Sequence, residues 1–341
     1  MKERFSESAM HKQGNDLPEQ IEEALNSHLP LLPTSRTVCV CGMGASALAG
    51  DVVSDYADST TGSPVTVVRG IELPGWVVRE TTVICVSYSG NTKEVLIAYE
   101  EARSRGCPVV CITVGGELMQ RCISQRQVLI QVPGGLQSRG AFGYLLGYLS
   151  RVLEEMNICG AATALRGIQP ELKKHRDKLI SDENTLVEDI AKTLLHKIPV
   201  IYSLANMRSS AIRWKTQINE NSKFISFCGS LPEFNHNEIV GWTNDENNRI
   251  FMPVILYDDG ASGIIRCMMD TSIGIIEDKK LKIVSYHVKG SCNLEKNLKC
   301  IILGDFVSLQ LAYLRKTDPY ADIPVEEVNS LVIVDEDESR V

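Results

Sequence analysis

Short apolar runs that alternate with helical patterns constrain the fold of this 341-residue chain more than any other feature. The runs are rich in Val, Ile and Cys and are apolar throughout, which is typical of parallel strands buried on both faces. In the first half they lie at 37–41, 65–68, 82–86, 109–113 and 128–132. Helical patterns follow from 46, over 93–105 and from 139. We therefore predict a parallel sheet between two layers of helices.

A second alternation occupies the last third of the chain. Its strand-like runs and helices lie at 199–202, 207–221, 224–227, 250–256, 281–287 and 293–316. Residues 161–196 are rich in Lys, Glu and Asp at helical spacing, without a Gly/Ser tract. We predict an α/β domain at 1–160 with a leading helix, a helical connection at 161–196, and a second α/β domain at 197–341 with C-terminal helices.

Composition narrows the class of protein. Hydrophobic residues make up 44% of the chain, enough for two cores, and the net charge of −8 argues against a general nucleic-acid binder. The eleven cysteines form no small disulfide framework, which favours a reducing compartment. The charged N-terminus leads to no signal-like apolar segment, and no run reaches about 18 apolar residues. We expect a soluble, cytoplasmic protein with neither a nucleic-acid nor a membrane partner.

Three side-chain hydroxyls follow the third apolar run, at Ser87, Ser89 and Thr92. They precede a helical pattern, and the N-terminus of a helix favours an anion such as a phosphate monoester. Gly90 relaxes the backbone of this loop. The alternative is an ordinary turn in which a Ser or Thr caps the helix, but one hydroxyl suffices for a cap. The loop is therefore predicted to bind phosphate.

A glycine-rich loop follows the first apolar run and matches the loose dinucleotide pattern G-x-G-x-x-A over 42–47. Arg69 follows the second run, where a carboxylate would read the ribose of NAD, so only an NADP variant of that interpretation remains. In the competing interpretation, Gly44 and Ser46 join the hydroxyl loop around one phosphate. The third interpretation is a plain strand-to-helix turn that binds no ligand.

Arg139 stands at the opening of a long apolar helix, where a positive charge opposes the helix dipole. A guanidinium keeps its charge and offers five donors, so one role for Arg139 is to stabilise an oxyanion in a cleft. The alternative is a surface arginine paired with a carboxylate.

The densest polar cluster lies in the second half. Arg213, Gln217 and Glu220 share one helix face, which could also be solvated. A short predicted strand separates Glu220 from His236, so we expect both side chains at the same end of a sheet, as a general base and a general acid. The alternatives are a hydrogen-bonded structural histidine and a metal site of His236 with Glu238, which lacks the usual second histidine.

Taken together, these motifs resemble those of the bifunctional phosphoglucose/phosphomannose isomerases, which belong to the sugar isomerase (SIS) domain group. The Ser-Tyr-Ser-Gly-Asn-Thr loop alone indicates an SIS domain, and the last two motifs are more specific. The motifs are Gly42-Met43-Gly44-Ala45-Ser46, Ser87-Tyr88-Ser89-Gly90-Asn91-Thr92, Gln137-Ser138-Arg139-Gly140, Arg213-Trp214-Lys215, Asn219-Glu220-Asn221-Ser222-Lys223 and Asn235-His236-Asn237-Glu238.

The resemblance implies two SIS-type three-layer αβα domains and an aldose–ketose isomerase that interconverts glucose 6-phosphate, and mannose 6-phosphate, with fructose 6-phosphate through an enediolate. It implies glycolysis and gluconeogenesis as the pathways, and neither a cofactor nor a metal. It also implies a homodimer with shared active sites, with His236 of the neighbouring subunit opening the sugar ring. Glu220 would move the proton and Arg139 would stabilise the enediolate. The implied phosphate ligands are Gly44, Ser46, Ser87, Ser89 and Thr92.

The chain departs from the family pattern at two places. Ala45 stands where the family usually has glycine, and a methyl group would be strained there if the backbone needs a positive φ. The family also has a lysine near its C-terminus, but residues 329–332 hold none, and Lys316 lies before the stretch at 318–328 that resembles the family motif. A non-catalytic sugar-phosphate sensor is therefore the alternative function, and the preference between the glucose and mannose epimers stays open.

Overall fold

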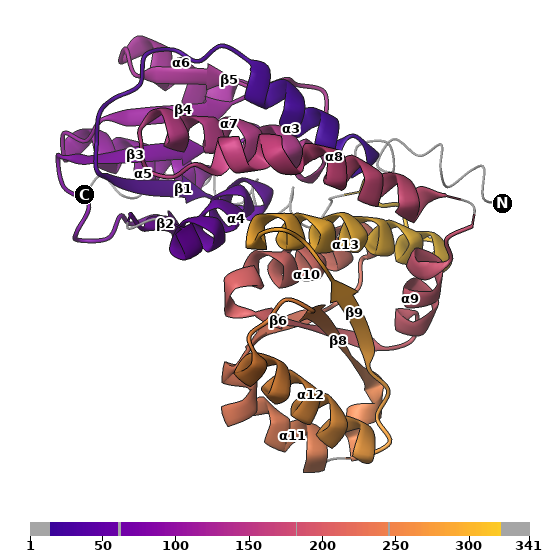
Figure 1. Cartoon of the computed structure of the whole chain (residues 1–341). Coiled ribbons are helices and arrows are strands. Elements are labelled where there is room, and N and C mark those ends of the chain that lie inside the picture. The colour runs from indigo at the N-terminus through magenta and orange to yellow at the C-terminus, as the bar shows by residue number, and fades with distance from the viewer. Residues whose placement is uncertain (1–13, 61–62, 182, 245, 322–341) are drawn as a thin grey trace, which may run out of the picture.

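The computed structural model describes residues 14–60, 63–181, 183–244 and 246–321 (Figure 1). The first half forms a sheet of five strands in the order β2-β1-β3-β4-β5, and every neighbouring pair is parallel. The strands are β1 (Thr37–Gly42), β2 (Val65–Val68), β3 (Thr81–Val86), β4 (Val109–Thr113) and β5 (Val128–Gln131). These are the predicted runs, within one residue at each end.

Helices cover both faces of this sheet. Alternate strand residues such as Val40 and Ile84 pack against one helical layer, and Cys39 and Cys85 pack against the other. The first layer holds α3 (Leu17–Asn26), α4 (Gly44–Thr60) and α7 (Phe142–Glu155), and the second holds α5 (Lys93–Ser104) and α6 (Gly116–Ser124). A strand therefore contributes to two separate cores, which explains why its sequence is apolar throughout.

The second half repeats the architecture with a smaller sheet in the order β7-β6-β8-β9, again parallel throughout. Its strands are β6 (Ile198–Leu204), β7 (Phe227–Leu231), β8 (Phe251–Asp258) and β9 (Val284–Val288). One face packs against α10 (Arg208–Ser222) and α13 (Asn293–Arg315), and the other against α11 (Glu238–Asn244) and α12 (Gly263–Asp278). The predicted fold class of two parallel-sheet α/β units with flanking helices is confirmed.

One strand position was predicted wrongly. The strand expected at 224–227 begins only at Phe227, because the preceding residues form the connection from α10. Ser226 is tied to that helix: its N–H donates to Asn219 Oδ1 at 3.0 Å, and its hydroxyl donates to the carbonyl of Lys215 at 3.0 Å. Phe224 therefore packs against the shared core from outside the sheet, and Ile225 is 59% exposed.

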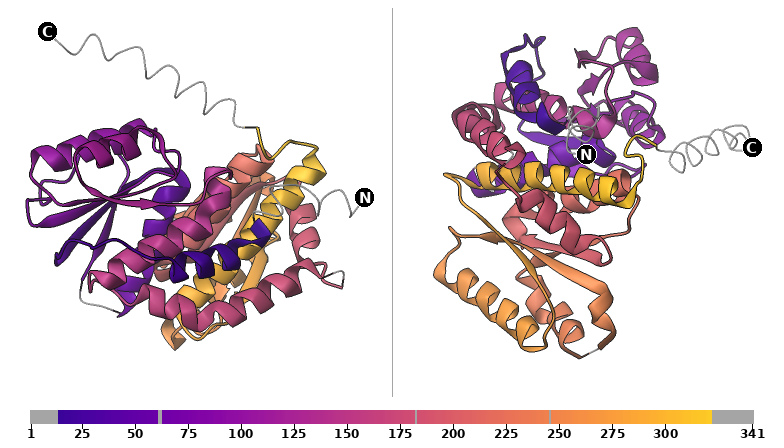
Figure 2. Two further views of the ribbon diagram at one scale, coloured as in Figure 1. Left: turned by 90° about the horizontal axis from the view of Figure 1, so that it is seen from above. Right: turned by 90° about the vertical axis from the view of Figure 1, so that its right-hand side faces the viewer.

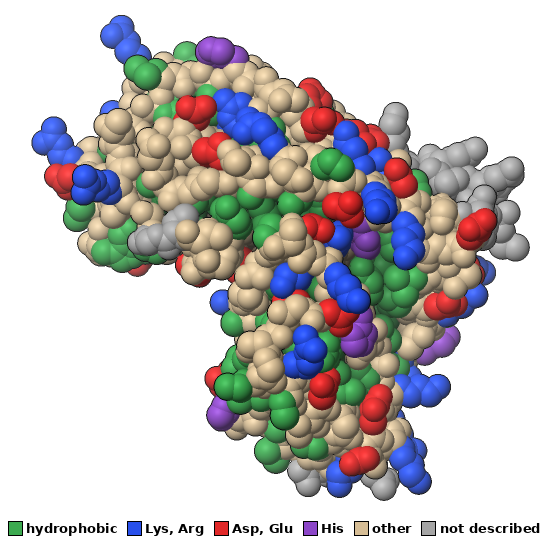
Figure 3. Space-filling view, viewed as in Figure 1, with side chains coloured by type: hydrophobic (Ala, Val, Ile, Leu, Met, Phe, Trp, Pro, Cys, Tyr) green, Lys and Arg blue, Asp and Glu red, His purple; other side chains and the backbone are tan. Residues whose placement is uncertain are grey.

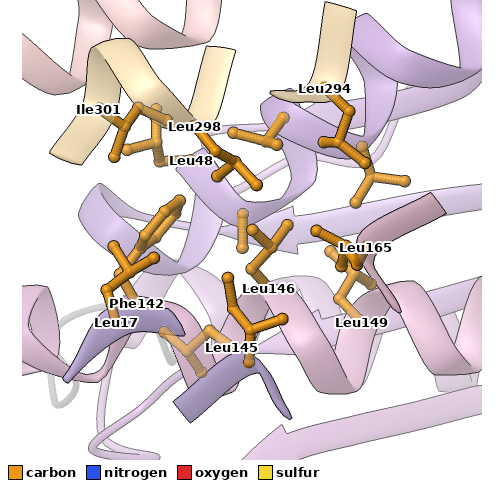
Figure 4. Packing of buried hydrophobic residues seen from close by; sticks show 14 of the residues in the cluster. Leu17, Leu48, Phe142, Leu145, Leu146, Leu149, Leu165, Leu294, Leu298 and Ile301 are labelled. Atoms are coloured by element: carbon orange, nitrogen blue, oxygen red, sulfur yellow. The ribbon is translucent and has the colours of Figure 1, made fainter. Parts of the chain in front are cut away.

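A single hydrophobic core connects the two halves. Figure 4 shows Leu298 and Ile301 of α13 beside Leu48 of α4 and Phe142 of α7. Figure 2 shows α13 lying between the two sheets. The predicted helical connection consists of α8 (Ala161–Ile180) and α9 (Leu186–Leu194), which pack against α13. The domain boundaries at 160 and 196 stay a prediction, because one hydrophobic core contains residues from both sides of each boundary.

Helix α13 is long and apolar enough to cross a membrane by length and composition, and it is the one such helix in the described part of the chain. Its most apolar window is 78% buried inside the molecule. Its residues Leu298, Ile302 and Phe306 belong to the shared core. The apolar character of α13 is thus accounted for by its central position.

Candidate active site

Two loops that were predicted to hold one phosphate leave adjacent strands of the first sheet. β1 and β3 are parallel neighbours, with Gly42 in register with Val86. The strand order reverses between them, since β1 connects to β2 on one side and β3 to β4 on the other. At such a point, the crevice beyond the carboxyl ends of the strands is where parallel α/β sheets bind ligands. The loops at 43–46 and 87–92 border this crevice.

Hydrogen bonds inside the second loop fix its hydroxyl groups. The hydroxyls of Ser87 and Thr92 lie 2.9 Å apart, and Ser87 Oγ also accepts the N–H of Gly90 at 3.1 Å. Thr92 occupies the N-cap position of α5, but its side chain makes no capping hydrogen bond. The exposed Ser89 accepts the N–H of Asn91 at 3.2 Å. The ordinary capping interpretation therefore fails for Thr92.

Gly90 is required by the backbone of this loop. Its φ is +73°, and a Cβ added there would lie 1.8 Å from the carbonyl oxygen of Gly115. The N–H of Leu118 donates to the carbonyl of Gly90 at 2.8 Å, so the first turn of α6 holds the loop from the other side. The loop is thus held by contacts within the chain itself.

The first loop places its one positive φ at Gly44, where φ is +50°. Ala45 has no positive φ, so the expected strain of its methyl group does not arise. Ser46 lies in the first turn of α4 and is 4% exposed. Arg69, on which the NADP interpretation rested, donates to Asp51 at 3.0 Å from Nη1. Its guanidinium is thus engaged by a carboxylate of the chain itself.

Arg139 is buried and connects the two halves of the molecule. It belongs to the 3₁₀ turn η1 (Ser138–Ala141) before α7 and is 4% exposed, so the surface-arginine interpretation is wrong. Its Nε donates to Asn221 Oδ1 at 3.0 Å, and its Nη2 donates to the carbonyl of Pro319 at 2.5 Å. Nη1 lies 3.6 Å from Glu220 Oε2. The arginine and the carboxylate of the predicted chemistry are therefore neighbours.

A buried ion pair between Arg213 and Asp305 lies next to Arg139. Arg213 donates to the backbone carbonyl of Arg139 at 2.9 Å and binds Asp305 with two hydrogen bonds of 2.8 Å. Burial raises the pKa of Asp305, although Arg213 partly offsets this. Arg213 and Gln217 are each 2% exposed, so the alternative of a merely solvated helix face does not apply to them. Asp305 was missed by the sequence analysis, because it lies inside an apolar helix with no motif around it.

Glu220 stands in the last turn of α10, with a side chain that is 36% exposed. The adjacent Asn221 is buried and is itself fixed: its Nδ2 donates to Gln217 Oε1 and to Ser308 Oγ, both at 2.9 Å. Asn221 is therefore held so that its Oδ1 meets Arg139. The Asn-Glu-Asn motif combines a carboxylate that solvent can reach with an amide that orients the arginine.

His236 does not meet Glu220 within one chain, so the expectation that both lie at the same end of a sheet is wrong. Helix α10 runs back to the amino edge of the second sheet before β7 begins, whereas His236 lies in η3 (Glu233–His236), beyond the carboxyl end of β7. The five residues of β7 span about 16 Å. His236 is exposed.

The metal interpretation of His236 with Glu238 has no support in the geometry. Glu238 Oε2 accepts the hydroxyl of Tyr202 at 2.6 Å, and burial together with this carboxylate raises the pKa of Tyr202. Among the described residues, no group of three or more His, Cys, Asp and Glu side chains could hold a metal ion. The family's lysine stretch falls mostly outside the described residues. Two residues of that region are described. Lys316 is exposed and forms the C-cap of α13, and the carbonyl of Pro319 accepts the hydrogen bond from Arg139.

Comparison with protein-family models gives two matches. Residues 31–122 match the model described as "SIS domain", and residues 183–331 match the "Bacterial phospho-glucose isomerase C-terminal SIS domain". The first match contains both loops at the crevice, and the second contains Glu220 and His236. The two matched ranges thus include the predicted site residues of both halves of the chain, apart from Arg139.

Curated relatives extend the similarity to nearly the whole chain. A bifunctional phosphoglucose/phosphomannose isomerase of Aquifex aeolicus is 34% identical, over 87% of this chain and 89% of the relative. A protein of the same name from Caldicellulosiruptor bescii is 31% identical, over 93% of this chain and 96% of the relative. A solved structure of a hypothetical protein from Thermus thermophilus matches with a TM-score of 0.77 at 14% identity, over 97% of this chain and 92% of the other. At that identity it supports the fold alone.

Proposed function

The chain belongs to the bifunctional phosphoglucose/phosphomannose isomerase family, and on this premise we propose how its residues act on a hexose 6-phosphate. The enzyme is an aldose–ketose isomerase that interconverts glucose 6-phosphate and mannose 6-phosphate with fructose 6-phosphate. The reaction moves a proton between C1 and C2 through an enediolate. It therefore needs a base beside these carbons and positive charge beside the oxygen that becomes negative.

The phosphate group of the sugar binds in the crevice between β1 and β3. Ser46, Ser87, Ser89 and Thr92 supply hydroxyl donors, and Gly44 lets the backbone approach. This proposal is supported by the position of both loops at the point where the strand order reverses, and by the rigid hydrogen bonding of the second loop. The helix N-termini of α4 and α5 add a favourable dipole.

Glu220 is the base that transfers the proton, and Arg139 stabilises the enediolate. The observation that carries this assignment is the 3.6 Å separation of Arg139 Nη1 and Glu220 Oε2, because the two residues come from opposite halves of the chain. Arg139 follows β5, so it stands at the same sheet edge as the two phosphate loops. The base, the cation and the phosphate loops therefore face one crevice.

The active unit in this proposal is a homodimer in the cytoplasm, active in glycolysis and gluconeogenesis. His236 of the neighbouring subunit serves as the acid that opens the sugar ring. The separation of Glu220 and His236 by the length of β7 supports an exchange between subunits over a site within one chain. The missing lysine remains the argument for the alternative of a sugar-phosphate sensor without turnover.

The test is a coupled assay with each of the three sugar phosphates, on the wild type and on Glu220→Gln. The substitution keeps the shape of the side chain and removes its basicity, so kcat should fall by about 10²–10⁴-fold while a phosphorylated inhibitor still binds. Glu171→Gln, on the exposed side of α8, is the matched control and should leave kcat unchanged. Wild-type binding without any turnover would favour the sensor. Turnover that survives in Glu220→Gln would remove this residue from the mechanism.

A further inference from the structure

The second sheet has a cavity beyond the carboxyl ends of its strands. Its strand order reverses between β6 and β8, since β6 is followed by β7 on one side and β8 by β9 on the other. Parallel α/β sheets bind ligands at such a point. The cavity has a volume of about 410 Å³, and it is lined by Leu204, Leu231 and Asp258, the last residues of β6, β7 and β8. It therefore corresponds in position to the crevice of the first sheet.

Two charged side chains at this cavity are buried. Lysine and arginine side chains are spread over the visible surface in Figure 3, as charged residues normally are. Lys296 is 8% exposed and Asp258 is 2% exposed, and both line the cavity. Nζ of Lys296 donates to Oδ2 of Asp258 at 2.7 Å. The fold thus places a buried ion pair in the wall of the cavity.

The lysine of this pair keeps hydrogen-bonding capacity for a ligand. Both oxygens of Asp258 have a donor, since Oδ1 accepts the N–H of Gly260 at 2.8 Å. The ammonium of Lys296 has three N–H groups. Among the residues that the structure describes, Asp258 is the one acceptor of Nζ. Two N–H groups therefore remain for a ligand, while the carboxylate is already satisfied.

Two long helices begin at the cavity and add further donors. Ser262 is the N-cap of α12, where its side chain makes no capping hydrogen bond, and Asn293 is the first residue of α13. Both residues line the cavity. The first turn of a helix holds N–H groups without partners inside the helix, at the positive end of its dipole. These groups favour an anion, and a phosphate monoester offers more negative charge and more acceptor oxygens than a carboxylate.

We propose that this cavity binds the phosphate group of a small phosphorylated metabolite, with Lys296, Ser262 and Asn293 as donors. The side chains of Leu204 and Leu231 give the carbon part of the ligand an apolar surface. Within one chain the site is separate from the first crevice, because the cavity lies at the carboxyl edge of the second sheet and α10 ends at its amino edge. The proposal involves no turnover of the ligand, so it goes beyond the proposed function.

Calorimetric titration with inorganic phosphate tests this proposal without substrate. The wild type should bind two phosphates per chain, one in each crevice. Asn293→Asp keeps the size of the side chain and adds a negative charge at the cavity, and the fold should persist because an acid is favourable in the first turn of a helix. The affinity for one phosphate should fall by about tenfold or more. The matched control is Asn26→Asp, at the exposed end of α3, which adds the same charge and should change neither affinity.

A second variant, Lys296→Met/Asp258→Asn, removes both charges together, so that neither is left buried and unpaired. It should lose the same phosphate, whereas Ser89→Ala should weaken the other one. An Asn293→Asp variant that binds phosphate as the wild type does would overturn the proposal, as would equal losses in Asn293→Asp and Asn26→Asp. Acetate that displaces this phosphate at equal concentration would overturn the choice of phosphate over carboxylate. If Ser89→Ala leaves both affinities unchanged while Asn293→Asp loses one, the error lies in the proposed function and not in the cavity.

Discussion

At the scale of single residues, Asn221 has a role in the site that the sequence motif does not reveal: it positions Arg139. Its side chain is one acceptor for the guanidinium of Arg139, and Gln217 and Ser308 hold it in place. Glu220 needs solvent access to reach a substrate, but Asn221 is 1% exposed. The two neighbours therefore serve different purposes: one acts on the sugar, and the other positions the arginine.

Asn221→Ala tests this positioning role. The substitution leaves Arg139 Nε without its acceptor in a buried site, which costs about 1–3 kcal/mol. Arg139 should lose its fixed orientation, so kcat should fall while the affinity for a phosphorylated inhibitor, which the loops bind, stays near the wild-type value. Ser308→Ala is the control, because it removes a partner of Asn221 and keeps the bond to Arg139. Equal losses of kcat in both variants, with equal losses of thermal stability, would indicate a purely structural role.

At the scale of elements, the loop between β3 and α5 is built before ligand arrives. Ser89 is its exposed hydroxyl, and its one described hydrogen bond comes from the nearby N–H of Asn91. Ser87 and Gly90, in contrast, hold the loop together. Within residues 87–92, we therefore expect Ser89 to contribute to phosphate binding, and Ser87 and Gly90 to contribute to the stability of the loop.

Ser89→Ala should weaken a phosphorylated inhibitor without lowering the melting temperature of the free protein. Each hydrogen bond lost to a charged group costs roughly 1.5–3 kcal/mol of affinity. Calorimetric titration of the inhibitor and a thermal melt give the two quantities. Ser124→Ala, an exposed serine at the end of α6, should change neither. Equal inhibitor affinity in Ser89→Ala and wild type would place the phosphate elsewhere.

The elements also show where prediction from sequence succeeds and where it fails. The strands of the first sheet were predicted within a residue because each is a short apolar run between helical patterns, and the central strands β3 and β4 are buried along their whole length. β7 was misplaced because an apolar stretch beside a turn has the same composition as a strand. Glu220 and His236 were expected together because the direction of α10 relative to β7 depends on the sheet topology, which no local pattern records. Asp305 was not found for a related reason: its partner Arg213 is remote in sequence.

At the scale of the whole molecule, the proposed exchange of His236 predicts complementation between two inactive chains. Glu220→Gln and His236→Ala should each be inactive alone. A mixed dimer would hold one site with both lesions and one site with both residues intact. Random mixing should restore about one quarter of wild-type activity, since half of the dimers are mixed and each has one working site. Co-refolding followed by an assay of fructose 6-phosphate formation measures this. Mixed dimers that form and stay inactive would place His236 outside the shared site.

The path of α13 through the shared core has a consequence for how the protein is made. A ribosome releases the chain from its N-terminus, so the first sheet and its helices emerge long before residues 293–315. α13 later covers one side of α4 and α7, which includes Leu48 and Phe142. Until α13 is made, this side has no helix packed against it. The first half must wait for the end of its own synthesis to be complete, and during that interval its uncovered apolar side is a natural target for cellular chaperones.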